Sequence, residues 1–170
     1  MPGPCQAMHS GTAGAGLACL VMKTILVPVD LSAACPAVCD AACDLARLMD
    51  AHVVLLHVVQ PPPVMVMEIY ALDAGRAEEM LVAAAEAGTD RLRDLAARCV
   101  KRGVEAETVH RIGLPVVEIL SRAKEADYIV MGSHGHGAMY DLLVGSTTRG
   151  VLKKAPCPVV VVPQKRPRGR

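Results

Sequence analysis

The sequence contains no tryptophan or phenylalanine and only three tyrosines among its 170 residues. Proteins that bind single-stranded nucleic acid stack its bases on aromatic side chains, so this composition argues against that function. The formal net charge of +1 also lacks the basic excess that nucleic-acid binding requires. We therefore expect no nucleic-acid partner, and any planar ligand must be held by aliphatic side chains and backbone groups.

The chain also lacks the segments that direct proteins to membranes. No stretch reaches the ~18 uninterrupted apolar residues of a transmembrane helix, and residues 1–21 have none of the Lys or Arg that a secretory signal needs. The seven cysteines include no CxxC pair, which argues against a zinc ribbon or a thioredoxin-like site. We expect a cytoplasmic protein with reduced thiols and no membrane partner.

Three cysteines share one face of an expected helix. Cys35, Cys39 and Cys43 are spaced by four residues, which is typical of a metal-binding or redox stripe or of small apolar residues packed on a sheet. We favour packing, because ligand sets usually draw on two or more elements and no fourth ligand is evident.

Length and composition indicate one folded domain. A chain of 170 residues with 52% hydrophobic content is long enough for a single sizeable core. Residues 1–21, rich in Gly and Pro, are expected to form a flexible extension, with Met22 as an alternative translation start. Residues 22–163 form the expected domain, and residues 164–170 an expected basic, disordered tail.

Hydrophobic patterning predicts alternating strands and helices. Strands are expected at 24–30, 53–59, 104–112, 128–131 and 159–162, with helices at 33–49, 76–102, from 115 and at 145–154. We expect Ser32 to cap the first helix, Gly103 to end the second, His57 to lie in the core and 104–112 to lie near a sheet edge. This order predicts an α/β fold with a five-stranded parallel sheet covered by helices on both faces.

Ligands of such sheets bind beyond the carboxyl ends of the strands. That rule selects residues 28–32, residues 57–60 and the glycine-rich segment after Met131. Here Gly132-Ser133-His134-Gly135 is followed, after nine residues, by Gly145-Ser146-Thr147-Thr148. Glycines allow close approach to a phosphate, and a helix N-terminus with hydroxyl groups favours an anion. The alternative is that the glycines only form turns and the hydroxyls only cap a helix.

Other nucleotide-binding and hydrolase signatures are absent from the sequence. It contains no G-x4-G-K-[ST] P-loop, no G-x-G-x-x-G after the first expected strand and no G-x-S-x-G elbow.

The chain resembles the universal stress protein family. The spacing G-x2-G-x9-G-[ST] is the signature of that family's ATP-binding branch, and it is matched without a gap. Residues 22–32, 55–58 and 155–162 are also similar to the family's sequences, so the resemblance covers about residues 22–163. It implies a Rossmann-like fold of the adenine nucleotide alpha hydrolase type, with strand order 3-2-1-4-5.

The resemblance also implies a site for an adenine nucleotide, namely ATP with Mg²⁺ or Mn²⁺ on its phosphates. Val58 and Met131 would contact the adenine. Asp30 would lie near the ribose or a phosphate-bound metal, and we favour that role over capping the next helix. The other residues implied to line the site are Pro28, Val29, Gly132, Ser133, His134, Gly135, His136 and Gly137, with Gly145, Ser146, Thr147 and Thr148 on the phosphates.

Two classes of function remain open at this point. The first is a nucleotide-binding regulatory module of the stress response, which forms a homodimer through the strand Val159–Val162 and signals to a regulatory protein partner. The second is a slow ATPase or phosphotransfer enzyme of the same fold; a third possibility is a chaperone-like dimer that uses no nucleotide. We favour binding, because no evident catalytic base is paired with an electrophilic Arg or Lys.

Overall fold

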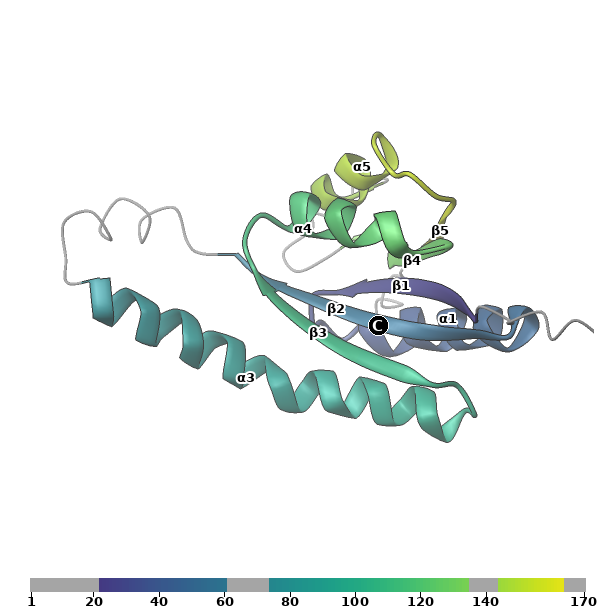
Figure 1. Cartoon of the computed structure of the whole chain (residues 1–170), viewed down its shortest axis with the longest axis horizontal. Helices are drawn as coiled ribbons and strands as arrows, with labels where there is room; N and C mark the ends of the chain where they lie inside the picture. Colours follow the sequence, from purple (N-terminus) through teal and green to yellow (C-terminus); the bar gives the residue numbers. More distant parts are fainter. Residues whose placement is uncertain (1–21, 61–73, 135–143, 164–170) are drawn as a thin grey trace, which may run out of the picture.

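The fold is built on one parallel sheet whose central strand is the first in the chain. The computed structural model describes residues 22–60, 74–134 and 144–163, and its strands follow the order β3-β2-β1-β4-β5 (Figure 1). All four strand pairs are parallel. The predicted fold class and strand order are therefore confirmed.

The elements follow the predicted order with small shifts at their ends. The strands are β1 (Lys23–Val29), β2 (Ala51–Val59), β3 (Ala106–Ile112), β4 (Tyr128–Gly132) and β5 (Val159–Val162). The helices are α1 (Cys35–Met49), α3 (Ala74–Lys101), α4 (Pro115–Arg122), the short 3-10 helix η1 (Ala123–Glu125) and α5 (Ser146–Leu152). The expected extension 1–21 and tail 164–170 lie outside the described residues.

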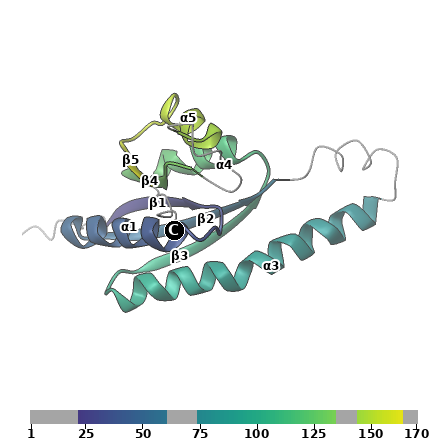
Figure 2. The same cartoon turned by 180° about the vertical axis from the view of Figure 1, so that it is seen from behind.

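Helices cover both faces of the sheet. In Figures 1 and 2, α1 and α3 lie on one face and α4 and α5 on the other. Ile25, Val27 and Val29 of β1 belong to the core on the α1 and α3 side, whereas Leu26 belongs to the core on the α4 and α5 side. Successive strand residues point to opposite faces, so a strand covered on both faces is apolar throughout.

Of the two predicted helix-end residues, the structure contradicts Ser32 and confirms Gly103. The prediction that Ser32 caps α1 is wrong: the cap is Ala34, and the Ser32 hydroxyl instead accepts a 3.4 Å hydrogen bond from the Ala34 N–H within the preceding turn. The prediction for Gly103 is confirmed. It follows the end of α3 with a φ of +76°, and the N–H of Val104 bonds back to the Cys99 carbonyl at 3.1 Å.

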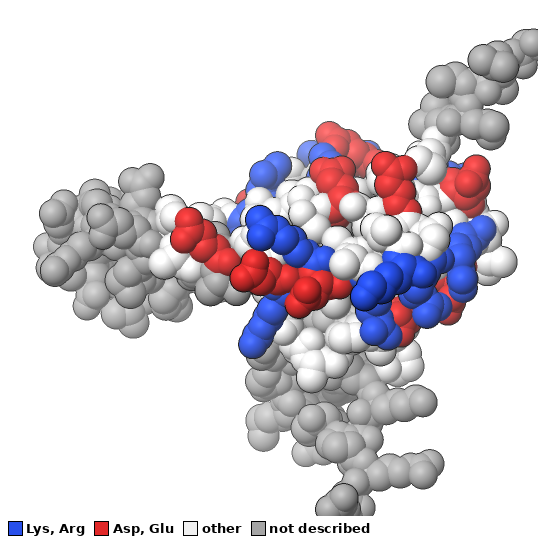
Figure 3. Space-filling model, turned by 90° about the horizontal axis from the view of Figure 1, so that it is seen from below, with Lys and Arg blue, Asp and Glu red and all other residues white. Residues whose placement is uncertain are grey.

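Charge is mixed over the face that α1 and α3 form. Lys and Arg side chains there lie beside Asp and Glu (Figure 3), so no broad area of one sign gathers on this face. Within the ranges that the structure describes, no helix combines the length and apolar character needed to cross a membrane.

Candidate functional site

The candidate site lies where the order of strands in the sheet reverses, between β1 and β4. From β1 the chain proceeds to β2 and β3 on one side of the sheet, and then to β4 and β5 on the other. Pairing between β1 and β4 runs from Ile25 with Tyr128 to Leu26 with Ile129 and ends there. Residues 27–29 and 130–132 lie beyond this paired stretch, and Pro28 has no N–H to extend it. The carboxyl ends of β1 and β4 therefore flank the position at which parallel sheets of this kind bind ligands.

Asp30 lies at the end of β1 in a constrained turn. Its Oδ1 accepts hydrogen bonds from the N–H of Ser32 at 3.1 Å and from the thiol of Cys35 at 3.2 Å. Leu31 has a φ of +60°, which is uncommon for a residue other than glycine and often marks a functional site. Burial, reinforced by the Asp30 bond, raises the pKa of Cys35 to about 11, so this thiol stays protonated and donates. Asp30 thus shapes its own turn and does not cap α1.

The two ends of the glycine-rich segment meet beside β4. The N–H of Gly145 donates to the Ser133 carbonyl at 2.8 Å, and the Thr148 hydroxyl donates to the Gly132 carbonyl at 2.9 Å. The Ser133 N–H in turn bonds to the Val162 carbonyl of β5 at 2.9 Å. Tertiary contacts therefore bring together the first and last parts of the G-x2-G-x9-G-[ST] motif.

The hydroxyl-bearing residues after Gly145 differ in their exposure. Ser146 is exposed and Thr147 half-buried, whereas Thr148 is only 3% exposed. The N–H groups of the first turn of a helix have no acceptor within the helix, so Ser146 and Thr147 present both N–H and hydroxyl donors. Thr148 instead uses its hydroxyl to hold Gly132.

The apolar residues expected to contact adenine lie on one face of the sheet. Met131 is 4% exposed within the core beneath α4 and α5, and Val58 packs against the same core. His134 follows the carboxyl end of β4, with its Nδ1 3.0 Å from the Ser133 hydroxyl. Gly135, His136 and Gly137 lie outside the described residues.

The cysteine stripe is part of the core. Cys35, Cys39 and Cys43 are at most 4% exposed and pack between α1 and the sheet, as expected of small apolar side chains. Across residues 22–60, 74–134 and 144–163, no three His, Cys, Asp or Glu side chains are grouped to hold a metal ion.

Sequence reasoning missed one polar contact near the site. His57, expected as a core histidine, is half-buried and faces His110 of β3, with the two Nδ1 atoms 3.5 Å apart. The strand order implied by the family resemblance already placed these strands side by side. Their register, which aligns the two histidines, was the missing information.

Comparison with known proteins gives one consistent family. The family model described as "Universal stress protein family" matches residues 22–163. Universal stress protein Sll1654 from Synechocystis is 32% identical over 147 residues, which cover 85% of this chain and 87% of that protein.

Solved structures show the same likeness. UspA from Lactobacillus plantarum is 30% identical, with a TM-score of 0.70 over 82% of this chain and 97% of that one. Protein MJ0577 from Methanocaldococcus jannaschii is 27% identical, with a TM-score of 0.74 over 85% of this chain and 97% of that one.

Proposed function

The chain belongs to the universal stress protein family, and we propose that it binds an adenine nucleotide at the carboxyl ends of β1, β2 and β4. The ligand we propose is ATP with Mg²⁺ or Mn²⁺ on its phosphates. Two universal stress proteins of the same fold were solved in complex with cAMP and, in the protein from Archaeoglobus fulgidus, with dAMP. They are 22% and 23% identical to this chain, so their ligands motivate the choice of an adenine nucleotide and carry no residue assignment.

The observation that carries the proposal is the closure of the glycine-rich segment. The bonds from Gly145 to Ser133 and from Thr148 to Gly132 set the N–H groups that open α5 beside the end of β4. In the proposed complex, Ser146 and Thr147 donate to phosphate oxygens, since an anion satisfies N–H groups that lack a helical acceptor. Within the site Thr148 is a positioning residue, because its hydroxyl is engaged by Gly132.

Residues at the neighbouring strand ends are proposed to contact the adenine and the ribose. Val58 and Met131 supply an aliphatic contact for the adenine, which suits a chain without Trp or Phe. In the proposed complex, Pro28 and Val29 at the end of β1 border the nucleotide, and Asp30 lies near the ribose or the phosphate-bound metal. His134, with the motif residues Gly135, His136 and Gly137, completes the phosphate side of the site.

The proposal is tested by titrating the full chain with ATP and with adenosine, each with Mg²⁺, in a calorimeter. ATP is expected to bind and to raise the melting temperature. Asp30→Asn is expected to weaken ATP more than adenosine, because the change affects the metal and phosphate end of the ligand. Neither heat nor a rise in melting temperature with ATP would overturn the proposal. ADP measured in the same samples distinguishes a binding module from a slow ATPase.

We also propose that the protein acts as a regulatory homodimer joined through β5. β5 lies at an edge of the sheet, and Val160 is 40% exposed. An uncovered edge strand leaves backbone groups unpaired, and a second copy of β5 would pair them. The candidate site and β5 are linked through the bond between Ser133 and Val162, so nucleotide binding is positioned to stabilise the dimer that a partner protein recognises.

A further inference from the structure

Two histidines from neighbouring strands face each other beneath α3. His57 of β2 and His110 of β3 are register partners, and their rings meet edge to face with centroids 5.2 Å apart and an interplanar angle of 88°. Their Nδ1 atoms are 3.5 Å apart, so one imidazole can donate its Nδ1 proton to the other. Both side chains are half-buried.

The pair also contacts the turn that carries Asp30, through α3. Gly88 lets this helix come so close that a methyl group there would lie 3.0 Å from Leu31 Cδ1 and 3.1 Å from His57 Cε1. Leu31 follows Asp30 directly and has the left-handed φ of +60°. The position of α3 over His57 is therefore coupled by contact to the conformation of the Asp30 turn.

The geometry of the pair disfavours the state in which both rings are protonated to imidazolium. When both rings are imidazolium ions, each Nδ1 carries a hydrogen and the contact becomes repulsive. His110 Nε2 is buried with no hydrogen-bond partner in the part of the chain that the structure describes, so a charged His110 would bury an N–H without an acceptor. Burial accordingly lowers the pKa of His110. The doubly charged pair is therefore disfavoured while α3 packs over it.

Four charged residues lie near the pair along the described chain. Asp30 lies next to Leu31, while Glu86 and Arg91 are exposed on the turns of α3 on either side of Gly88. Arg111 follows His110 and is exposed. Among the described ion pairs, none of these four groups is a partner of His110.

We propose that the His57–His110 pair is a pH-dependent positioning device for the nucleotide site. With at most one proton shared between the rings, α3 closes on Leu31 and holds the Asp30 turn. With both rings charged, α3 separates at Gly88, the turn loosens and nucleotide is released. This inference rests on the proposed nucleotide-binding function and adds acid control to it.

The test compares nucleotide affinity across pH in four proteins. ATP with excess Mg²⁺ is titrated at about pH 7.5, 6.5 and 5.5 into wild type, His57→Asn, His110→Asn and His52→Asn. His52 is the matched control, since it lies at the opposite end of β2 and contacts Thr24. Between the highest and the lowest pH, wild type and His52→Asn are expected to lose ATP affinity about tenfold more than His57→Asn and His110→Asn do. The protonation of ATP itself affects all four proteins equally.

A second measurement, without nucleotide, separates this inference from the proposed function. Amide hydrogen exchange at Gly88 and Thr89, corrected for its intrinsic pH dependence, is expected to accelerate at the acidic end in wild type and not in His110→Asn. Equal pH profiles of affinity in all four proteins, or exchange that does not respond to pH, would overturn the inference. Exchange that responds to pH while no protein binds ATP would overturn the proposed function and its acid control, and would leave standing only the pH-dependent opening of α3.

Discussion

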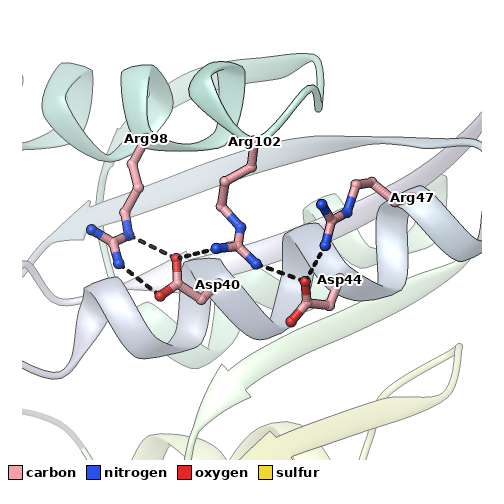
Figure 4. Close-up of polar contacts among 5 residues, drawn as sticks. All are labelled: Asp40, Asp44, Arg47, Arg98 and Arg102. Atoms are coloured by element: carbon pink, nitrogen blue, oxygen red, sulfur yellow. Dashed lines mark hydrogen bonds and ion pairs between the residues drawn. The ribbon is translucent and has the colours of Figure 1, made fainter.

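Arg98 of α3 and Asp40 of α1 are joined by two parallel hydrogen bonds, from Nε to Oδ1 and from Nη2 to Oδ2, both 2.7 Å long (Figure 4). Arg102 continues the contact to Asp44 at 2.7 Å, and Arg47 also bonds to Asp44, at 2.6 Å. This network anchors the carboxyl-terminal part of α3 to α1. The contact of α3 with Leu31 and His57 at Gly88 lies earlier in the helix, outside this network.

Asp40→Asn is expected to destabilise the fold by about 0.5–1 kcal/mol at neutral pH, the range of a partly exposed ion pair. The Arg98 hydrogen bonds lower the pKa of Asp40. The carboxylate therefore contributes its stability above the unfolded-state pKa of about 4, and loses it as pH falls through the lower folded-state pKa. Thermal melts of both proteins from neutral to acidic pH should converge at the acidic end.

Asp90→Asn is the control for that prediction. Asp90 pairs with Arg93 on the same helix at 3.3 Å, and both side chains are largely exposed. Removing this pair is expected to leave the melting temperature almost unchanged at every pH. A loss equal to that of Asp40→Asn would contradict a specific role for the link between helices.

Thr148→Val keeps the shape of the side chain and removes the donor to the Gly132 carbonyl. We expect a loss of about 1 kcal/mol in unfolding free energy without ligand, together with weaker ATP binding. Ser146→Ala, at an exposed position, should weaken ATP binding and leave the ligand-free melting temperature unchanged. Equal changes in ligand-free stability and in ATP binding for the two variants would contradict the assignment of Thr148 to positioning and of Ser146 to phosphate contact. Melting curves with and without ATP provide both readouts.

Gly150→Ala tests the packing of α5 on α4. A methyl group at Gly150 would lie 2.8 Å from Cγ2 of Val116, a stiff side chain that has little freedom to move. We expect destabilisation of about 1–3 kcal/mol, measured by denaturant unfolding. Adding Val116→Ala to the same chain should recover part of the loss, because it makes room for the methyl group. A double variant less stable than either single variant would refute this steric explanation.

Val161→Pro tests the proposed dimer. The carbonyl of Pro158 accepts a bond from Ile129 of β4, and that of Val162 accepts one from Ser133, directly after β4. The backbone groups of Val161, which alternate with them, therefore face the open edge. Proline there removes the outward N–H and is tolerated on edge strands. Sedimentation should show a folded 17.9 kDa monomer for the variant and twice that mass for wild type. Val160→Pro, whose N–H faces β4, should instead lower the melting temperature; a monomeric wild type would rule out the dimer.

Much of the candidate site was accessible from the sequence because it is local. The motif from Gly132 to Thr148 lies in one stretch of chain, and Asp30 directly follows an apolar strand. The roles within the motif were not accessible. Ser146 and Thr148 are chemically alike, and the orientation of α5 on β4 decides which of them turns its hydroxyl inward.

The sequence by itself determined the alternation of strands and helices, the burial of the sheet on both faces and the position of the glycine-rich segment, because these depend on hydrophobic period and backbone freedom along the chain. Only the tertiary structure decided which side chains meet: His57 with His110, 53 residues apart, Cys35 with Asp30, and Gly88 with Leu31. Such contacts depend on strand register and on how closely a helix approaches the sheet. A shift of one residue in register would send His110 to the opposite face.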